Sequence, residues 1–380
     1  MKLALKRCVF FALLLCFFAL PVAAQETELD TARANEEYGV FLKAIPPEIA
    51  ELLPESFFSS SLETGEAPLR EAGGVSAVFR VIGKLTGLAV GENLALLAKI
   101  CGLLLLAAVA RTLASERGGG VGKAYSFCTT LAMAVLLLSL QRGKMAKLEA
   151  FFDTVMALCA AILPMMGTLY AMGGNLRRAV VNHGVLSSFL AVLETLCAGT
   201  VMPLAGICLA FALMDAVTGR AGLRALAGVI KRTYVLTVGF LMGLLCFVLG
   251  TQSTLAKASD TLALRTARFA AGSFLPLVGG SVSETLRTVA GSVEYLRAVA
   301  GTGAILVLFF AFLPTFLSVL LTRIAFLLGG AVAGLLSCDA EQKLLGELSS
   351  VYGYFLAIIA VLFVTFLFSL TLFARCAAAG

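Results

Sequence analysis

The chain has 380 residues, 60% of them hydrophobic and 14% charged, and its mean hydropathy is +0.98. Soluble globular domains are about half apolar and about a quarter charged. A chain this apolar could not cover its surface with polar groups, so the composition excludes an ordinary soluble enzyme and indicates an integral membrane protein. The bases behind the formal net charge of +6 are scattered between apolar stretches. That distribution argues against nucleic-acid binding, which needs bases gathered on one face.

Residues 1–24 have the three parts of a secretory signal peptide. A basic start precedes the apolar stretch 8–20, and Pro21–Ala24 offers a small-residue cleavage site. The apolar stretch is shorter than the ~20 residues that a membrane span needs. We therefore predict cleavage after Ala24, with an uncleaved anchor as the alternative. In either case the chain from Gln25 onward is expected outside the cytoplasm.

Residues 25–90 form an acidic segment, with 11 acidic and five basic residues. Pro46, Pro47 and Pro54 interrupt it, and Ile49 and Leu53 lie on one helical face. The segment has too few apolar residues for a stable domain of its own. It is expected to form short extracytoplasmic helices that lie on the membrane or on a partner.

Seven apolar stretches follow, and each is predicted to be a transmembrane helix because lipid cannot satisfy free backbone N–H and C=O groups. The predicted spans are Asn93–Leu113, Ala124–Leu140, Ala150–Met172, Val185–Ala216, Val229–Gly250, Gly301–Leu321 and Val351–Ala374. A shorter apolar stretch, Leu327–Leu336, is interpreted as re-entrant or interfacial. The predicted fold class is therefore all-α, a polytopic helical membrane protein with about seven spans after a signal peptide.

The orientation of the later loops stays open at this point. Val185–Ala216 is too long for one straight span and contains Pro203, so it is either kinked or a re-entrant pair. With an exported N-terminus, the basic loop at Arg117 falls inside, as the positive-inside rule prefers. The basic group from Arg142 to Lys147 then falls outside, against the rule.

Residues 252–300 are more polar than their neighbours and include an amphipathic helix. Its apolar positions recur in steps of four and three residues, whereas Glu284, Arg287, Glu294 and Arg297 occupy the other face. The apolar positions are Val282, Leu286, Val289, Val293, Leu296 and Ala300. Such a helix suits a membrane surface or a partner helix, and a helix packed on its own protein would show the same pattern.

The segment Phe274–Gly280, which reads Phe-Leu-Pro-Leu-Val-Gly-Gly, precedes this helix. Proline ends one helix, and a glycine pair permits backbone conformations that other residues resist. A loop of this kind can line a pore or form a docking surface, and a plain hinge would look the same. The candidate residues are Phe274, Pro276, Gly279, Gly280, Glu284 and Arg287.

The stretch Arg268–Leu313 resembles the signature region of the stage III sporulation protein AE family of endospore-forming Firmicutes. The resemblance rests on Phe274–Gly280, Ser283–Thr285, Val289–Gly291 and the apolar stretch that opens at Gly301. Leu275 and Leu277 depart mildly from the family pattern, which favours β-branched residues. The rest of the chain agrees in layout, with a signal peptide, an acidic exported stretch and several spans.

The resemblance implies a role and no reaction. Family members are expected in the mother-cell membrane that surrounds the forespore, as subunits of a channel or secretion-like complex with other stage III sporulation membrane proteins. Membrane lipid and further copies of the chain are the other expected partners. The alternative function is a secondary transporter or permease for a small solute, although no inverted repeat with paired broken helices is recognisable.

Sequence motifs for catalysis, a cofactor or a metal are lacking. The glycines of Gly118–Lys123 have the wrong spacing for a phosphate loop, and Ala124 replaces the magnesium-binding hydroxyl. His183 is the single histidine, so no histidine-rich metal site or Ser/His/Asp relay is expected. Most of the ten cysteines lie within apolar stretches and are interpreted as small buried residues.

Three charged residues fall within or beside predicted spans: Lys99, Glu194 and Asp215. A charge at the bilayer centre costs a few kcal/mol and often marks a functional site. Lys99 could therefore pair with Glu194 inside the bundle. The alternative is that both lie near helix ends and extend to water.

Overall fold

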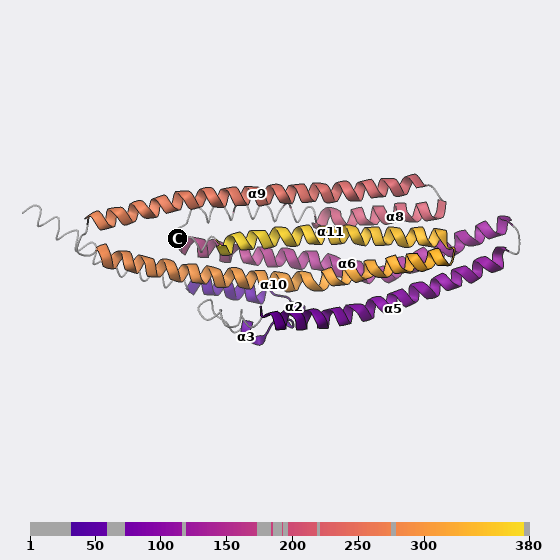
Figure 1. The fold of residues 1–380 in the computed structure, drawn as a ribbon, viewed down its shortest axis with the longest axis horizontal. Helices are drawn as coiled ribbons and strands as arrows, with labels where there is room; N and C mark the ends of the chain where they lie inside the picture. Colours follow the sequence, from indigo (N-terminus) through magenta and orange to yellow (C-terminus); the bar gives the residue numbers. More distant parts are fainter. Residues whose placement is uncertain are drawn as a thin grey trace, which may run out of the picture.

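The computed structural model describes residues 32–58, 73–115, 119–172, 184, 192, 197–218, 221–274 and 279–375. Within these ranges every regular element is helical, which confirms the all-α prediction. Residues 32–43 are helical, and the elements that follow are α2 (Pro47–Ala50), α3 (Glu55–Phe58), α5 (Val75–Ser115), α6 (Gly119–Met172), the π-helical turn η1 (Cys197–Val201), α8 (Met202–Thr218), α9 (Ala221–Phe274), α10 (Gly279–Leu335) and α11 (Asp339–Arg375). The long helices lie side by side in an elongated bundle, with α9 and α5 on opposite sides of it (Figure 1).

Five of the described helices are long and apolar enough to cross a membrane, whereas the sequence predicted seven spans. The candidate spans are Ser76–Thr112, Phe127–Leu169, Gly222–Val248, Ala298–Leu335 and Asp339–Thr371. One of the two missing spans is accounted for at α6, because the predicted spans Ala124–Leu140 and Ala150–Met172 belong to one helix of 54 residues. The other is Val185–Ala216, which is not among the five candidates. The predicted piece Leu327–Leu336 likewise continues the helix of the preceding span, in α10.

The long predicted span Val185–Ala216 is described only in its second half. There, the π-helical turn η1 runs directly into α8, and Pro203 is the second residue of α8. The apolar helix Gly199–Asp215 is shorter than the five candidate spans. The signal peptide, residues 1–24, lies outside the described residues.

Side-chain contacts fix how the helices run relative to α11. Thr130 and Gln141 of α6 bond Glu341 and Tyr352 of α11, so the two helices are parallel. On α9, Lys231 bonds Glu347, and Gly250 lies level with Phe368; α9 is therefore parallel to α11 as well. α5, α8 and α10 run the opposite way.

The core of the bundle is apolar and rich in aromatic rings. Phe312 of α10 contacts Phe151 of α6 edge to face, with centroids 5.0 Å apart, and Phe363 of α11 at 5.3 Å. Phe310, Phe326 and Phe355 are fully buried in the same cluster. The three helices α6, α10 and α11 therefore share one core, which the remaining helices flank.

Close packing of α10 against α5 and α11 depends on glycine. A Cβ at Gly329 would lie 2.8 Å from Cγ2 of Ile100, whereas one at Gly330 would lie 3.8 Å from Leu345. Gly334 faces Gln342 at 2.9 Å. The Gly-x-x-x-Gly spacing Gly330–Gly334 thus lies at a helix contact, whereas the same spacing at Gly239–Gly243 has open space around it.

We expect Gly329→Ala to weaken the α5–α10 contact and Gly330→Ala to leave it nearly unchanged. The new methyl group at position 329 would overlap a buried isoleucine, and overpacking of this kind costs about 1–3 kcal/mol. At position 330 the same methyl group makes an ordinary contact. The free energies of unfolding of the two variants in detergent, compared with the unaltered chain, test this, and equal losses would contradict the packing described.

α9 and α10 extend beyond the C-terminal end of α11 (Figure 1). Arg323 lies against Gly353, and Phe312 against Phe363, so the residues of α10 and α11 pair in antiparallel register. Continued to Arg375, this register leaves about 22 residues of α10 beyond α11, a length of ~33 Å at 1.5 Å per residue. The parallel register of α9 leaves about 17 residues, or ~25 Å. We call these parts of the two helices the α9–α10 projection.

The N-terminal segment packs at the base of this projection. Its apolar positions recur every three or four residues and are buried against the bundle: Ala34, Tyr38, Phe41, Ile45, Ile49, Leu53 and Phe57. The Thr168 hydroxyl donates to the Glu37 carboxylate, and α2 contacts α10. Since Thr168 is near the end of α6, residues 32–57 lie at the same end of the bundle as the projection.

Candidate functional site

The described ends of the segment predicted as a pore or docking site, Phe274 and Gly279, lie at the far ends of the two helices of the α9–α10 projection. Phe274 is the last residue of α9, and Gly279 and Gly280 are the first two residues of α10. Pro276 lies outside the described residues. Glu284 and Arg287 fall within the first turns of α10. The candidate residues are thus brought together in sequence order around one helix–helix connection, far from the apolar core.

The three predicted intramembrane charges differ in their surroundings. Lys99 is exposed on α5, and Glu194 lies outside the described residues, so their predicted pairing remains a prediction. Asp215 is buried in α8, only 3% exposed, and its Oδ1 has no hydrogen-bond partner among the described residues. Of the two that the structure describes, Asp215 is the buried one.

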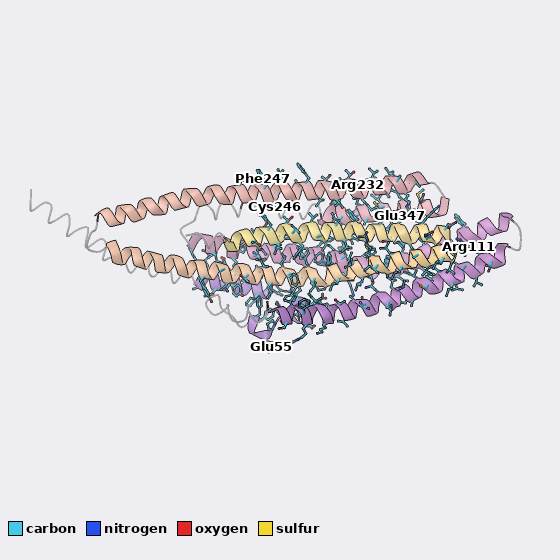
Figure 2. All side chains as sticks on the ribbon, viewed as in Figure 1. Glu55, Arg111, Arg232, Cys246, Phe247 and Glu347 are labelled. Carbon is cyan, nitrogen blue, oxygen red and sulfur yellow. The ribbon has the colours of Figure 1, made fainter. Side chains whose placement is uncertain are left out.

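A second buried carboxylate, Glu347 of α11, is held by two cations from α9. Arg224 Nε donates to its Oε1 at 2.6 Å, and Lys231 Nζ to its Oε2 at 3.1 Å. Lys231 also donates to the Ser350 hydroxyl at 2.6 Å. Because Lys231 and Glu347 are both about 7% exposed, this cluster fixes α9 to α11 with a charge that would be costly to leave unpaired. Glu347 is labelled in Figure 2.

A third carboxylate, Glu341, lies at the first turn of α11. Arg111 of α5 donates to one of its oxygens and, at 3.0 Å, to the carbonyl of Ser337. Thr130 of α6 donates to the other oxygen at 3.0 Å. Ser337 has a left-handed backbone, φ 54°, which ends α10 and turns the chain into α11. The cluster therefore joins α5 and α6 to this turn; Arg111 is labelled in Figure 2.

The middle of the bundle holds a smaller polar cluster. Lys144 of α6 donates to Asn93 of α5 at 2.7 Å and to Thr322 of α10 at 2.6 Å. Close by along α6, Gln141 accepts a hydrogen bond from Tyr352 of α11 at 2.5 Å. Lys144 thus belongs to the interior of a helix bundle and not to the basic loop that the sequence predicted between Arg142 and Lys147.

The chemistry of these clusters is structural. Each places a cation against carboxylate, amide or hydroxyl oxygens of neighbouring helices. Among the described residues, no three histidine, cysteine or carboxylate side chains gather in a way that could hold a metal ion. The six cysteines whose side chains the structure describes are free thiols, three of them buried. Polar contacts of this kind hold helices in register where the surroundings are apolar.

These buried residues were not singled out from the sequence, although one of them carried a visible signal. Lys231 lies inside the predicted span Val229–Gly250, beside Arg232, and a charge within a span needs a partner. Glu341 and Glu347 lie between two apolar stretches of the sequence, where charges are ordinary. Their cations lie 230 and 116–123 residues away along the chain, and no local pattern indicates such pairs.

The fold and its buried polar clusters together define a polytopic helical membrane protein. Residues 56–377 match the family model of stage III sporulation protein AE. The chain belongs to this family, as the resemblance around Phe274–Gly280 predicted. Stage III sporulation protein AE of Bacillus subtilis (strain 168) is 24% identical to it over 348 residues, which cover 89% of this chain and 84% of that protein. No solved structure is significantly similar to the chain.

Membership of this family indicates that the chain acts in sporulation. The five long apolar helices among its described residues indicate that it is a membrane protein. The family is one of sporulation membrane proteins and is not a recognised enzyme family. The match does not favour the transporter alternative.

Proposed function

We propose that the protein is a non-enzymatic membrane subunit of a channel or secretion-like complex between mother cell and forespore. The family supports the sporulation role. The observation that carries the proposal further is the α9–α10 projection. A pair of helices that continues about 25–33 Å past the end of α11 suits a subunit that reaches partners outside its own membrane.

The side of the membrane on which the projection lies follows from its neighbours. Residues 32–57 pack at its base, and the sequence predicts that this segment is exported. The opposite end of the bundle carries the turn between α10 and α11, close to the ends of α5 and α8. Arg117 and Arg220 follow those two helices in the sequence, as expected for a cytoplasmic end. The projection is therefore extracytoplasmic on this proposal.

The location proposed for the protein is the mother-cell membrane around the forespore, and its partners are other stage III sporulation membrane proteins. Copurification from sporulating cells tests this. An affinity-tagged chain, solubilised in mild detergent, should bring down other stage III membrane proteins, and its removal should arrest development after engulfment. Normal spore formation without the protein would overturn the proposal.

We expect alkaline phosphatase fused after residue 60 to be active, because the N-terminal segment is exported on this proposal. N-terminal sequencing of the mature protein should begin near Gln25. A matched fusion in the turn at residues 336–338 should be inactive, since that turn lies at the opposite end of the bundle. Activity of the second fusion with inactivity of the first would reverse the orientation.

A further inference from the structure

One side of α6 combines charged and small residues where a lipid-facing helix would carry large apolar ones. Arg142, Glu149 and Asp153 are exposed there. Lys147 is 77% exposed and lies 4.0 Å from Glu92 of α5, itself 60% exposed. Between Arg142 and Leu169 no large apolar side chain of α6 is exposed among the described residues. The exposed residues in between include Ala146, Ala150, Ala157 and Ala160. We call this surface, with Glu92, the α6 face.

At the same depth, α9 presents an apolar stripe. Gln141 of α6 is hydrogen-bonded to Tyr352 of α11, and Tyr234 of α9 packs on Tyr354 of α11 with ring centroids 5.7 Å apart. Because Tyr352 and Tyr354 are neighbours on α11, Gln141 and Tyr234 lie at about the same depth in the bundle. Measured along the helices from that depth, Asp153 of α6 lies ~18 Å away and Phe247 of α9 lies ~20 Å away, both in the same direction. The stripe consists of Leu236 (63% exposed), Phe240 (74%), Leu244 (49%) and Phe247 (67%). α9 is the outermost helix along the top of Figure 2, where Phe247 is labelled.

The α6 face and the apolar stripe of α9 cannot both face lipid, or both face water, without a large cost in free energy. A charge that faces lipid costs a few kcal/mol near the bilayer centre, and intramembrane charges therefore face the bundle interior or a water-filled cavity. The charges of the α6 face are exposed, so the interior of this chain does not hold them. A contiguous stripe of exposed leucine and phenylalanine, conversely, belongs in lipid or at an interface. α9 therefore suits the lipid, and the α6 face suits water.

We propose that several copies of this chain enclose a water-filled lumen, with their α6 faces inward and their α9 stripes toward lipid. One chain presents one such face, so a closed lumen needs further copies. The face carries two cations and three carboxylates, Arg142 and Lys147 with Glu92, Glu149 and Asp153, and charges of both signs allow identical faces to meet. Its alanines let neighbouring helices approach closely. The lumen would admit hydrated, polar solutes; its identification with the conduit of the sporulation complex rests on the proposed function.

Cysteine labelling in liposomes tests the lumen. In a variant whose ten cysteines are replaced by alanine, single cysteines are introduced as Glu149→Cys and Asp153→Cys. The matched controls are Phe240→Cys and Leu244→Cys, at the same depth on α9. A charged thiol reagent that does not cross membranes reacts with thiolates in water. We expect the α6 positions to react about tenfold faster or more than the controls.

A lipid-attached quencher read by a fluorophore at the same positions separates the other outcomes. Quenching at the α6 positions means that they face lipid, and neither labelling nor quenching means that dry protein covers them; both results would overturn the lumen. If the protein in native nanodiscs has the mass of a single chain, the proposal that several copies enclose the lumen is overturned. Because the protein is tested alone, these results are distinct from a failure of the copurification, which would count against the proposed complex.

Discussion

Replacing Glu347 by glutamine is expected to lower the free energy of unfolding by about 3–5 kcal/mol. The carboxylate of Glu347 is bonded by both Arg224 and Lys231, and Lys231 has little access to water. Loss of the negative charge leaves the buried Lys231 without a counter-charge, which is a larger effect than the loss of one hydrogen bond; Arg224 is 42% exposed and keeps its contact with water. Unfolding by a denaturing detergent, followed by circular dichroism, measures the difference. Separation of α9 from α11 is the expected first event.

Asp215→Asn provides a matched control, because it also neutralises a buried carboxylate. Among the described residues, Asp215 has an oxygen with no hydrogen-bond partner, so removal of its charge is expected to leave the free energy of unfolding equal or higher. Lys343→Gln, on the exposed side of α11, controls for a charge change in the same helix. If Glu347→Gln and Asp215→Asn destabilise equally, burial alone matters and the paired cations contribute nothing.

Changing Gly279 and Gly280 together to valine is expected to arrest forespore development after engulfment while the protein stays at normal abundance. The two glycines begin α10, four residues after the end of α9. Valine resists conformations that glycine allows and adds bulk where two helices are joined. The apolar spans are unchanged, so insertion into the membrane should proceed. Spore counts and immunoblots of membrane fractions measure the two quantities.

Ser281→Val controls for the presence of valine in the first turn of α10. It adds the same side chain one residue later and removes no glycine, so spore formation should stay near normal. Glu284→Lys combined with Arg287→Glu then tests whether the helix docks on a partner, since the swap reverses both charges and keeps their sum. Normal sporulation of the double valine variant at full abundance would reduce Phe274–Gly280 to a linker.

The sequence indicated the helical fold because long apolar stretches leave no other structure in lipid. It did not indicate where helices continue. Residues 141–149 were interpreted as a break because they carry four charges, yet Lys144 and Gln141 find partners on three other helices. Most of the stretch consists of good helix formers, so nothing local ends α6. The basic group that conflicted with the positive-inside rule lies within this helix and is not a loop.

The candidate site was predicted in part. The connection at Phe274–Gly280 was found because proline and paired glycine mark helix ends independently of tertiary structure. Glu347, Glu341 and Lys144 were missed because their partners lie on other helices, and pairing across a bundle depends on packing that one sequence does not display. The α6 face shows the same limit. Arg142 and Asp153 do not stand out in the sequence. Only in the structure are they seen as exposed charges at the same depth as the apolar stripe of α9.

The continuity of α10 has a mechanical consequence. It is one helix of 57 residues, with Pro314 inside it. Proline removes a backbone hydrogen bond and is the usual place for a helix to bend. About 35 residues, or ~52 Å, separate Pro314 from the tip. Between the projection and Pro314 the helix is packed in the core, where Ala300, Ala304 and Val307 are buried. A force on the tip is therefore transmitted along one continuous helix to Pro314, which lies beside the Phe312 cluster.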